Sequence, residues 1–338
     1  MYGENDNMNN NEKNIYYVSG TPHKLETPVL MIFFNRPEQF EKVFNAVRQA
    51  SPRILYLYQD GARKNKNDEY GINKCREILK KIDWDCEVHN WFRKENCGCD
   101  PSEYLSQKWV FSEVEKCIVL EDDDVPNQSF FLFCEDMLNK YENDERVNII
   151  CGMNHLGEYN KNNSDYFFST ICSIWGWASW SRVVNKWTSY YEFIQDSHTI
   201  SNLKFLDRNT HIREVLTASE KHCKSGIAYY ETILASDMFL NHRLNIIPSK
   251  NLISNIGIAA SSTHSADSIK KLPHGIRRVF NMSTYELDFP LQEPKYMVED
   301  IVYQKKVKRI LGWGHPLVKI YRKCERAFLM IWHKIFKL

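Results

Sequence analysis

Four consecutive carboxylates, residues 121–124, follow a short apolar run and come just before Pro126. Adjacent carboxylates repel one another and cannot all stay ionised in a dry interior. We therefore expect them at the mouth of a sheet, either in water or around a cation, since carboxylate oxygens are good ligands for hard divalent cations. The alternative is a solvated acidic turn that binds nothing.

Two further polar groups also follow short apolar runs. Asn35 and Arg36 come after residues 29–34, and Asp60 comes after residues 54–58. The carboxyl ends of parallel strands meet at one edge of an open α/β sheet, where ligands bind. The sequence therefore predicts that these side chains and the acidic turn share that edge.

The apolar runs alternate with segments in which apolar residues have helical spacing. Phe40, Val43, Phe44 and Val47 fall at i, i+3, i+4 and i+7, which places them on one face of a helix. This alternation predicts an α/β fold with a mixed, mostly parallel sheet flanked by helices. The predicted strands are 29–34, 54–58, 86–92, 117–120, 147–151 and 244–248.

Length and composition limit the number of domains and the kinds of partner that the protein can have. The 338 residues can form one large α/β domain with additions. A net charge of +1 gives no indication of a nucleic-acid partner, and we expect none. Ten cysteines lack zinc-site spacing, and we find neither a signal peptide nor an uncharged apolar stretch of about 18 residues, so we expect a cytoplasmic location.

Five sequence blocks occur in an order that resembles a known enzyme class. They are Phe34-Asn35-Arg36-Pro37, Gln59-Asp60-Gly61, Glu121-Asp122-Asp123 with Phe130-Phe131, Gly176-Trp177-Ala178-Ser179-Trp180, and Asn251-Leu252-Ile253-Ser254-Asn255-Ile256-Gly257 with Thr263-His264. Together they resemble the GT-A class of nucleotide-sugar glycosyltransferases. The greatest likeness is to bacterial sugar transferases related to N-acetylglucosaminyltransferase I, some of which carry a hemolysin-like label.

The resemblance implies a Rossmann-like GT-A catalytic domain over residues 28–265. Its nucleotide-binding half would be 28–151 and its acceptor half 152–265. Residues 1–27 are polar and rich in asparagine, so we expect a mobile leader. Residues 266–304 are expected to form an irregular C-terminal segment.

The resemblance also assigns roles within the acidic turn. It implies that Asp123 binds Mn²⁺ or Mg²⁺, while Glu121 and Asp122 contact the donor. Asp124 is additional to the common pattern, so it is a second candidate metal contact. His264 is a candidate contact to the diphosphate or the metal, although a lone histidine is more often a structural hydrogen-bonding group.

The nucleotide of the donor would lie against the first two strand ends. Asn35 and Arg36 are candidate contacts, but Arg36 could instead form a surface pair with Glu38. Asp60 resembles the base-recognising aspartate of the family, and a carboxylate that accepts the imide N–H of uracil favours UDP-sugars. The alternative is that Asp60 only stabilises a turn beside Gly61.

An inverting transferase needs a base that takes the proton of the acceptor hydroxyl. In relatives this base is an aspartate that follows an aromatic residue. The matching position here is Glu231, which follows Tyr230. The alternative is that Glu231 is an ordinary carboxylate on a helix surface. Asp237 and Asp196 are the alternatives. Trp177 could stack on a sugar of the donor, or it could simply pack in the core.

The C-terminal residues 305–338 contain ten Lys or Arg residues and one acidic residue, Glu325. From Pro316 onward the apolar and basic residues follow the pattern of an amphipathic helix, which is typical of segments that lie on anionic membranes. We therefore expect a peripheral location on the inner face of the cell membrane. The alternative is a helix packed on the catalytic domain or on a protein partner.

Taken together, the sequence predicts a metal-dependent, inverting glycosyltransferase. It would move a sugar from a nucleotide-sugar to a glycan or lipid-linked acceptor in surface polysaccharide synthesis. One alternative is a sugar nucleotidyltransferase, but residues 34–37 are not the Gly-rich basic loop expected there. The other is a non-catalytic protein that acts on membranes or binds sugars.

Overall fold

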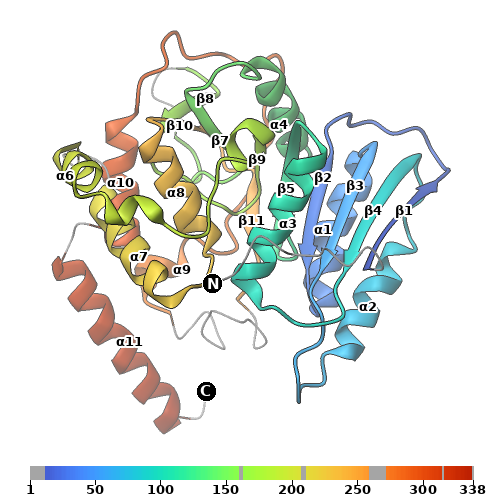
Figure 1. Ribbon diagram of the computed structural model, residues 1–338, viewed down its shortest axis with the longest axis horizontal. Coiled ribbons are helices and arrows are strands. Elements are labelled where there is room, and N and C mark those ends of the chain that lie inside the picture. Colours follow the sequence, from blue (N-terminus) through green and yellow to red (C-terminus); the bar gives the residue numbers. More distant parts are fainter. Residues whose placement is uncertain (1–11, 160–162, 207–210, 259–271, 314–315, 337–338) are drawn as a thin grey trace.

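The computed structural model describes residues 12–159, 163–206, 211–258, 272–313 and 316–336, which form an α/β fold around one large mixed sheet (Figure 1). Across this nine-stranded sheet the order is β1 (Lys13–Val18), β4 (Cys86–Phe92), β3 (Ile54–Gln59), β2 (Val29–Phe33), β5 (Lys116–Glu121), β9 (Trp177–Trp180), β7 (Val147–Cys151), β10 (Leu244–Pro248) and β8 (Tyr166–Ser169). A separate two-stranded ladder joins β6 (Asp124–Pro126) to β11 (Ile253–Asn255).

Four neighbouring strands, β4, β3, β2 and β5, run parallel, as the sequence pattern predicts. Strand β9 lies between β5 and β7 and is antiparallel to both. The outer strands β1 and β8 are also antiparallel to their neighbours. The sheet is therefore mixed, and its parallel centre brings the ends of β2, β3 and β5 to one edge.

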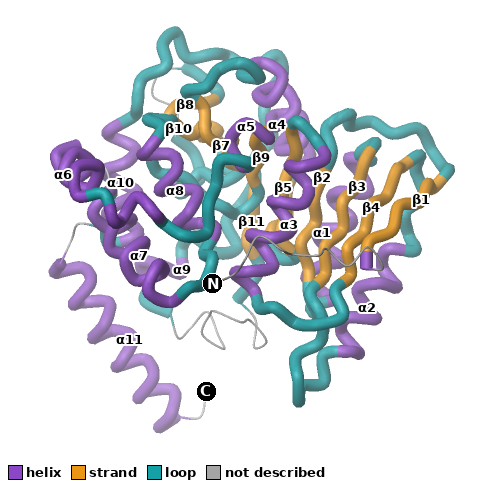
Figure 2. The backbone as a smooth tube through the Cα atoms, in the orientation of Figure 1, coloured by secondary structure: helices purple, strands orange, loops and turns teal. Residues whose placement is uncertain are grey.

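Helices cover both faces of the sheet (Figure 2). One core cluster joins it to α1 (Pro37–Ala50), α2 (Glu69–Leu79) and α4 (Gln128–Lys140), and the other joins it to α3 (Cys99–Glu113), α8 (Tyr230–Leu240) and α10 (Ile301–Leu311). The other helical elements are α5 (Ser181–Val184), the 3₁₀ helix η2 (Glu192–Gln195), α6 (Ser197–Leu206), α7 (Ile212–Ser225), α9 (His274–Arg277) and α11 (Pro316–Phe336).

Local sequence explains where the helices next to the acidic turn begin. The apolar positions predicted for α1, among them Phe40 and Phe44, are fully buried. Asn127 caps α4, because its Oδ1 accepts the backbone N–H of Phe130 at 3.1 Å. Gly98 precedes α3 with φ of 93°, a conformation that favours glycine.

The N-terminal prediction is wrong for its described part. Instead of belonging to a mobile leader, Lys13–Val18 forms β1, which pairs with β4 along its whole length. The side chains of Ile15 and Tyr17 are exposed, so the backbone ladder holds this edge strand. Leu25 is buried in the core. Residues 1–11 lie outside the described part of the chain.

The predicted C-terminal boundaries also need correction. Residues 305–311 do not belong to a separate tail, because they lie in α10, where Tyr303 and Val307 are buried in the main core. Asp300 caps this helix and accepts a hydrogen bond from the Tyr159 hydroxyl at 3.1 Å. The core therefore extends well beyond residue 265, and α11 projects from it (Figure 1). Among the described helices, none is both long and apolar enough to span a membrane.

Candidate active site

The acidic turn follows β5, as predicted, but its last residue begins the unpredicted strand β6, and the turn is more buried than predicted. Asp122 and Asp123 are only 4% and 7% exposed, and Asp124 is fully buried; Glu121 is partly exposed. Of our two expectations, carboxylates in water or around a cation, the first does not hold for the three buried ones. Hydrogen bonds and a cationic side chain from distant parts of the chain accompany the buried ones.

Asn255 on β11 holds two of these carboxylates. Its Nδ2 donates to Asp123 Oδ1 and to Asp124 Oδ1, both at 2.9 Å. The backbone N–H of Gly176 donates to Asp124 Oδ2 at 2.9 Å. Asp124, which the family pattern leaves unexplained, thus connects the acidic turn to the β6–β11 ladder and to the loop before β9. Burial raises the pKa of Asp124 well above its usual range, and the charges of Glu121 and Asp123 add to this.

Arg36 faces the same turn rather than forming the surface pair with Glu38 that we considered. Its guanidinium contacts Asp122, and its Nη2 lies 2.8 Å from Asp123 Oδ2. Burial alone would lower the pKa of Arg36, but the two aspartates raise it overall, so the side chain stays charged. Asp122 also accepts the backbone N–H of Phe34 at 3.3 Å.

Glu121, Asp123 and Asp124 form a group that fits a divalent cation. Each offers one carboxylate oxygen, and the three oxygens lie within 4.8 Å of one another. Burial raises the pKa of Glu121 to about 8, with the charge of Asp123 as the next cause. Gly257 borders the group so closely that a Cβ there would lie 2.2 Å from Asp123 Oδ2. Hard oxygen ligands of this kind suit Mn²⁺ or Mg²⁺, so acidic residues able to bind a metal are present.

A cavity at this edge brings together most of the predicted donor-binding residues. Its lining includes Asn35, Arg36, Asp60, Glu121 and Asp122. The same lining contains residues that the sequence did not single out, namely Tyr58, Arg63, Asn96, Cys99, Ser102 and Glu103. The cavity therefore lies between the ends of β2, β3 and β5 and the first turns of α3.

The Asp60 carboxylate is already fully hydrogen-bonded within the protein. It accepts from the backbone N–H groups of Gly61 (2.9 Å), Cys97 (3.0 Å) and Gly98 (3.0 Å), and from Asn96 Nδ2 (2.8 Å). A carboxylate has about four lone-pair sites, so all are in use. These hydrogen bonds favour the interpretation that Asp60 stabilises a turn. They show that it also holds the loop that leads into α3.

Asn35 also has a partner within the chain. It does not cap α1, because the residue before that helix is Arg36, and no side chain caps the helix. Asn35 Nδ2 instead donates to Asp68 Oδ1 at 2.7 Å, and Arg63 Nη2 contacts the same oxygen at 2.7 Å. Asp68 is buried and holds both side chains at the rim of the cavity.

The donor-stacking role predicted for Trp177 is not compatible with its position. The side chain is fully buried, and its ring stacks on Phe111 with 6.2 Å between centroids. Strand β9 turns this side chain into the core of the α3 face, so packing decides its role. Trp175, two residues earlier, is only partly buried and packs on Phe280 at 4.8 Å.

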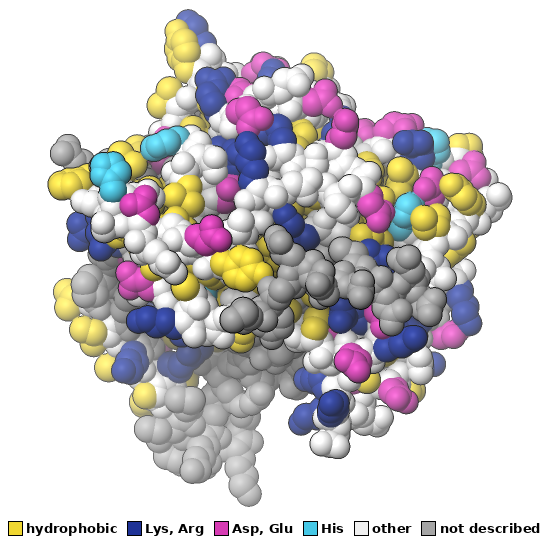
Figure 3. Space-filling view, in the orientation of Figure 1, with side chains coloured by type: hydrophobic (Ala, Val, Ile, Leu, Met, Phe, Trp, Pro, Cys, Tyr) yellow, Lys and Arg dark blue, Asp and Glu magenta, His cyan; other side chains and the backbone are white. Residues whose placement is uncertain are grey.

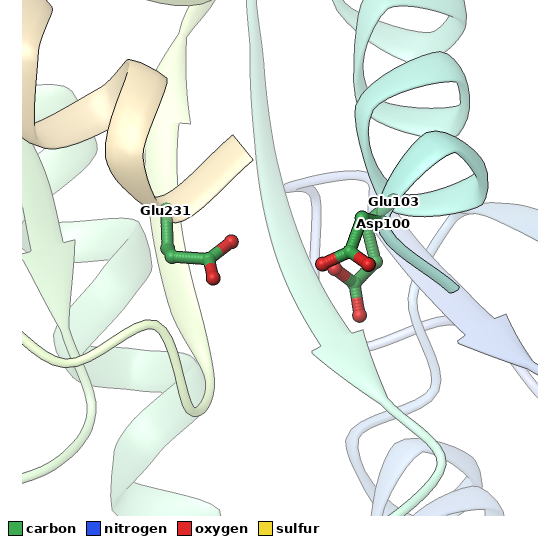
Figure 4. Close-up of side chains that lie close together, drawn as sticks. All are labelled: Asp100, Glu103 and Glu231. Atoms are coloured by element: carbon green, nitrogen blue, oxygen red, sulfur yellow. The ribbon is translucent and has the colours of Figure 1, made fainter. Parts of the chain in front are cut away.

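Glu231 lies in the first turn of α8 and points toward Asp100 and Glu103 on α3 (Figure 4). One oxygen from each of the three carboxylates lies within 4.8 Å of the others. Glu103 is 8% exposed, and its Oε1 accepts from the Cys99 thiol at 3.2 Å. Burial raises the pKa of Glu103 well above its usual range, with the charge of Glu121 as the next cause.

Neither alternative to Glu231 lies in this group. Asp237 forms a buried ion pair with Arg243 Nη1 at 2.5 Å, so its role is structural. Asp196 caps the start of α6, where its Oδ1 accepts the backbone N–H of His198 at 3.0 Å. His264 lies outside the described residues.

Two buried residues that were not predicted from the sequence connect the parts of the site. Tyr230 is fully buried, and its hydroxyl donates to Glu121 Oε1 at 2.8 Å. Glu103 was not predicted as a site residue; it lies in the first turns of α3, which begins at Cys99. An acidic residue in the middle of an otherwise buried helix face would have been the available signal.

Searches with the sequence find no matching family model, and no curated protein matches the chain. The case for a function therefore rests on the motif residues and on the geometry of the site.

Proposed function

We propose that this protein is a metal-dependent, inverting glycosyltransferase that uses a nucleotide-sugar donor and a glycan or lipid-linked acceptor. One observation carries the proposal. Glu121, one of the oxygen triad Glu121–Asp123–Asp124, lines the cavity at the sheet edge, and Tyr230 links it to the element that carries Glu231. The mixed sheet is compatible with the GT-A fold that the motif blocks resemble.

The donor would occupy the cavity with its diphosphate toward the acidic turn. A Mn²⁺ or Mg²⁺ ion held by Asp123, with Glu121 or Asp124, would offset the charge of the diphosphate leaving group. Arg63, whose side chain is partly exposed at the rim, adds positive charge. The preference for UDP rests on the resemblance alone, because the hydrogen bonds of Asp60 are complete within the chain.

The acceptor would approach from the side of α8. Glu231 is the proposed base, which takes the proton from the acceptor hydroxyl as that oxygen attacks the donor. Asp100 and Glu103 on α3 face it, so carboxyl groups of α3 and α8 meet at this point.

A direct test combines donor binding with turnover. We expect UDP with Mn²⁺ to raise the melting temperature, and UDP-sugars to be hydrolysed slowly when the acceptor is absent. Asp123→Asn should abolish both effects, since it removes the charge of the proposed metal ligand. Glu38→Gln is the matched control, because Glu38 is exposed beside the site and should behave like the unmodified protein.

The unmodified protein and the Asp123→Asn variant also distinguish the two alternative functions. Stabilisation by nucleoside triphosphates, with release of pyrophosphate from a sugar phosphate, would indicate a nucleotidyltransferase. Membrane lysis that survives Asp123→Asn would indicate a non-catalytic protein. If no nucleoside diphosphate stabilises the protein with Mn²⁺, the donor proposal fails.

A further inference from the structure

Helix α11 presents an apolar face to solvent. Leu317, Ile320, Tyr321 and Phe328 are 81%, 59%, 66% and 60% exposed. Their spacing of 3, 4 and 11 residues from Leu317 puts them on one side of the helix, within roughly 100° of arc. Single exposed apolar residues are ordinary, but a continuous row on one helix is not.

A different side of α11 holds the helix to the body of the protein. The guanidinium of Arg322 donates to the carbonyl oxygens of Ile310 and Arg309 at the end of α10. Arg322 lies roughly 140° around the helix from Leu317. The anchor therefore leaves the apolar face turned away from α10.

Basic side chains lie on the remaining sides of α11 and on α10. Lys323 and Arg326 are exposed on α11, and Lys305 and Arg309 are exposed on α10. Glu325 is the one acidic residue within the two helices. Figure 3 shows yellow apolar and dark blue basic side chains together along the lower left of the molecule, where Figure 1 places α11.

The helix also lies at the end of the molecule that holds the candidate site. Figure 1 shows α11 at the lower left, at the same end as the first turns of α3 and α8. Those turns carry Asp100, Glu103 and Glu231.

We propose that α11 docks on an anionic lipid bilayer, with its apolar face in the headgroup region and its exposed basic residues attracted by the lipid charges. Charge favours lipid over a second copy of the chain: a second copy would bring two basic helices together, which is unfavourable, whereas anionic lipids complement their charge. The docking itself does not depend on the enzyme proposal. Its consequence, that the acceptor is lipid-linked and reaches the site from the bilayer, rests on the proposed function.

The test is co-sedimentation of the full chain with vesicles. We expect binding to mixed phosphatidylcholine and phosphatidylglycerol vesicles, little binding to pure phosphatidylcholine, and release by high salt. The triple variant Leu317→Ser/Ile320→Ser/Phe328→Ser should lose binding. Lys323→Gln/Arg326→Gln should weaken it at least about tenfold. The matched control Tyr296→Ser/Val298→Ser removes exposed apolar residues elsewhere and should bind normally.

Other outcomes overturn the proposal. Equal binding by the triple variant would show that α11 does not dock, and a dimer that dissociates in that variant would identify a second copy as the occupant. Melting temperature and UDP binding, measured on the same variants, should stay unchanged. Loss of vesicle binding with intact UDP binding is thus distinguishable from failure of the enzyme proposal.

Discussion

The hydroxyl of Tyr230 donates a hydrogen bond of 2.8 Å to Glu121 Oε1, across 109 residues of sequence. Glu121 is a candidate cation ligand, and Tyr230 directly precedes the candidate base, Glu231. The bond therefore joins the two chemical halves of the proposed site. It also favours the ionised form of Glu121, against the burial that raises the pKa of this carboxyl to about 8.

Tyr230→Phe keeps the ring and removes this donor. We expect Mn²⁺ affinity to fall about fivefold near neutral pH, since one hydrogen bond contributes about 1 kcal/mol. Without the bond Glu121 holds its proton more strongly, so the deficit should shrink above the pKa of Glu121. Calorimetric Mn²⁺ titrations at about pH 7 and about pH 9 measure this difference in Mn²⁺ affinity. Tyr70→Phe, an exposed tyrosine, is the control; equal affinities for all three proteins would contradict the role.

Arg36→Met should destabilise the protein by about 3 kcal/mol, because it leaves Asp122 and Asp123 buried without their cation. A divalent cation can restore positive charge there, so Mn²⁺ should recover part of the loss. Urea unfolding with and without Mn²⁺ measures the loss of stability and its recovery. Arg53→Met breaks an exposed pair with Glu26 and should cost less than about 1 kcal/mol. Similar losses in both variants would remove the special role of Arg36.

Glu231→Gln should lower the turnover number of transfer by about 10²-fold to 10⁴-fold and leave donor affinity unchanged, because a base acts on the acceptor hydroxyl. Glu231→Asp should recover part of the rate, limited by its shorter side chain. Glu220→Gln, at an exposed position on α7, is the control. Steady-state kinetics with UDP binding by calorimetry separate the two effects. Full activity in Glu231→Gln would assign the base elsewhere.

Two buried histidines should make the free energy of unfolding decrease at acidic pH. Burial lowers the pKa of His155 to about 4 and that of His211 to about 3. Both are neutral in the folded state and take up protons on unfolding below about pH 6.5. Above that pH the two histidines do not reduce the free energy of unfolding. It should fall as the pH drops toward 4, by up to about 1.4 kcal/mol per pH unit for each histidine.

Urea titrations between neutral pH and pH 5 measure this dependence. His211→Phe removes one titrating group from a position stacked on Trp313, with 4.5 Å between ring centroids, and should flatten the slope. The exposed His198→Gln should leave the slope as it is. An unchanged slope in His211→Phe would mean that another group controls the acid response.

Short-range patterns were enough to locate most of the central sheet and the acidic turn. A fully buried strand such as Val29–Phe33 is an unbroken apolar run, and the Asn127 cap depends on residues three positions apart. Both signals are local, so the sequence carried them. The edge strand Lys13–Val18 was missed because it has no buried face and depends on backbone pairing with β4.

Local patterns in the chain were sufficient to predict the α/β class, the central strands and the clustering of acidic groups at one sheet edge. Which carboxylates are paired depends on the tertiary fold, since Asn255 reaches Asp124 across 131 residues. The tertiary fold also determines that Trp177 packs inward and that α3 and α8 bring Glu103 to Glu231. Periodicity fixes which face of an element is apolar. The ionisation and partners of a polar side chain depend on what distant segments place against it, and no local pattern records that.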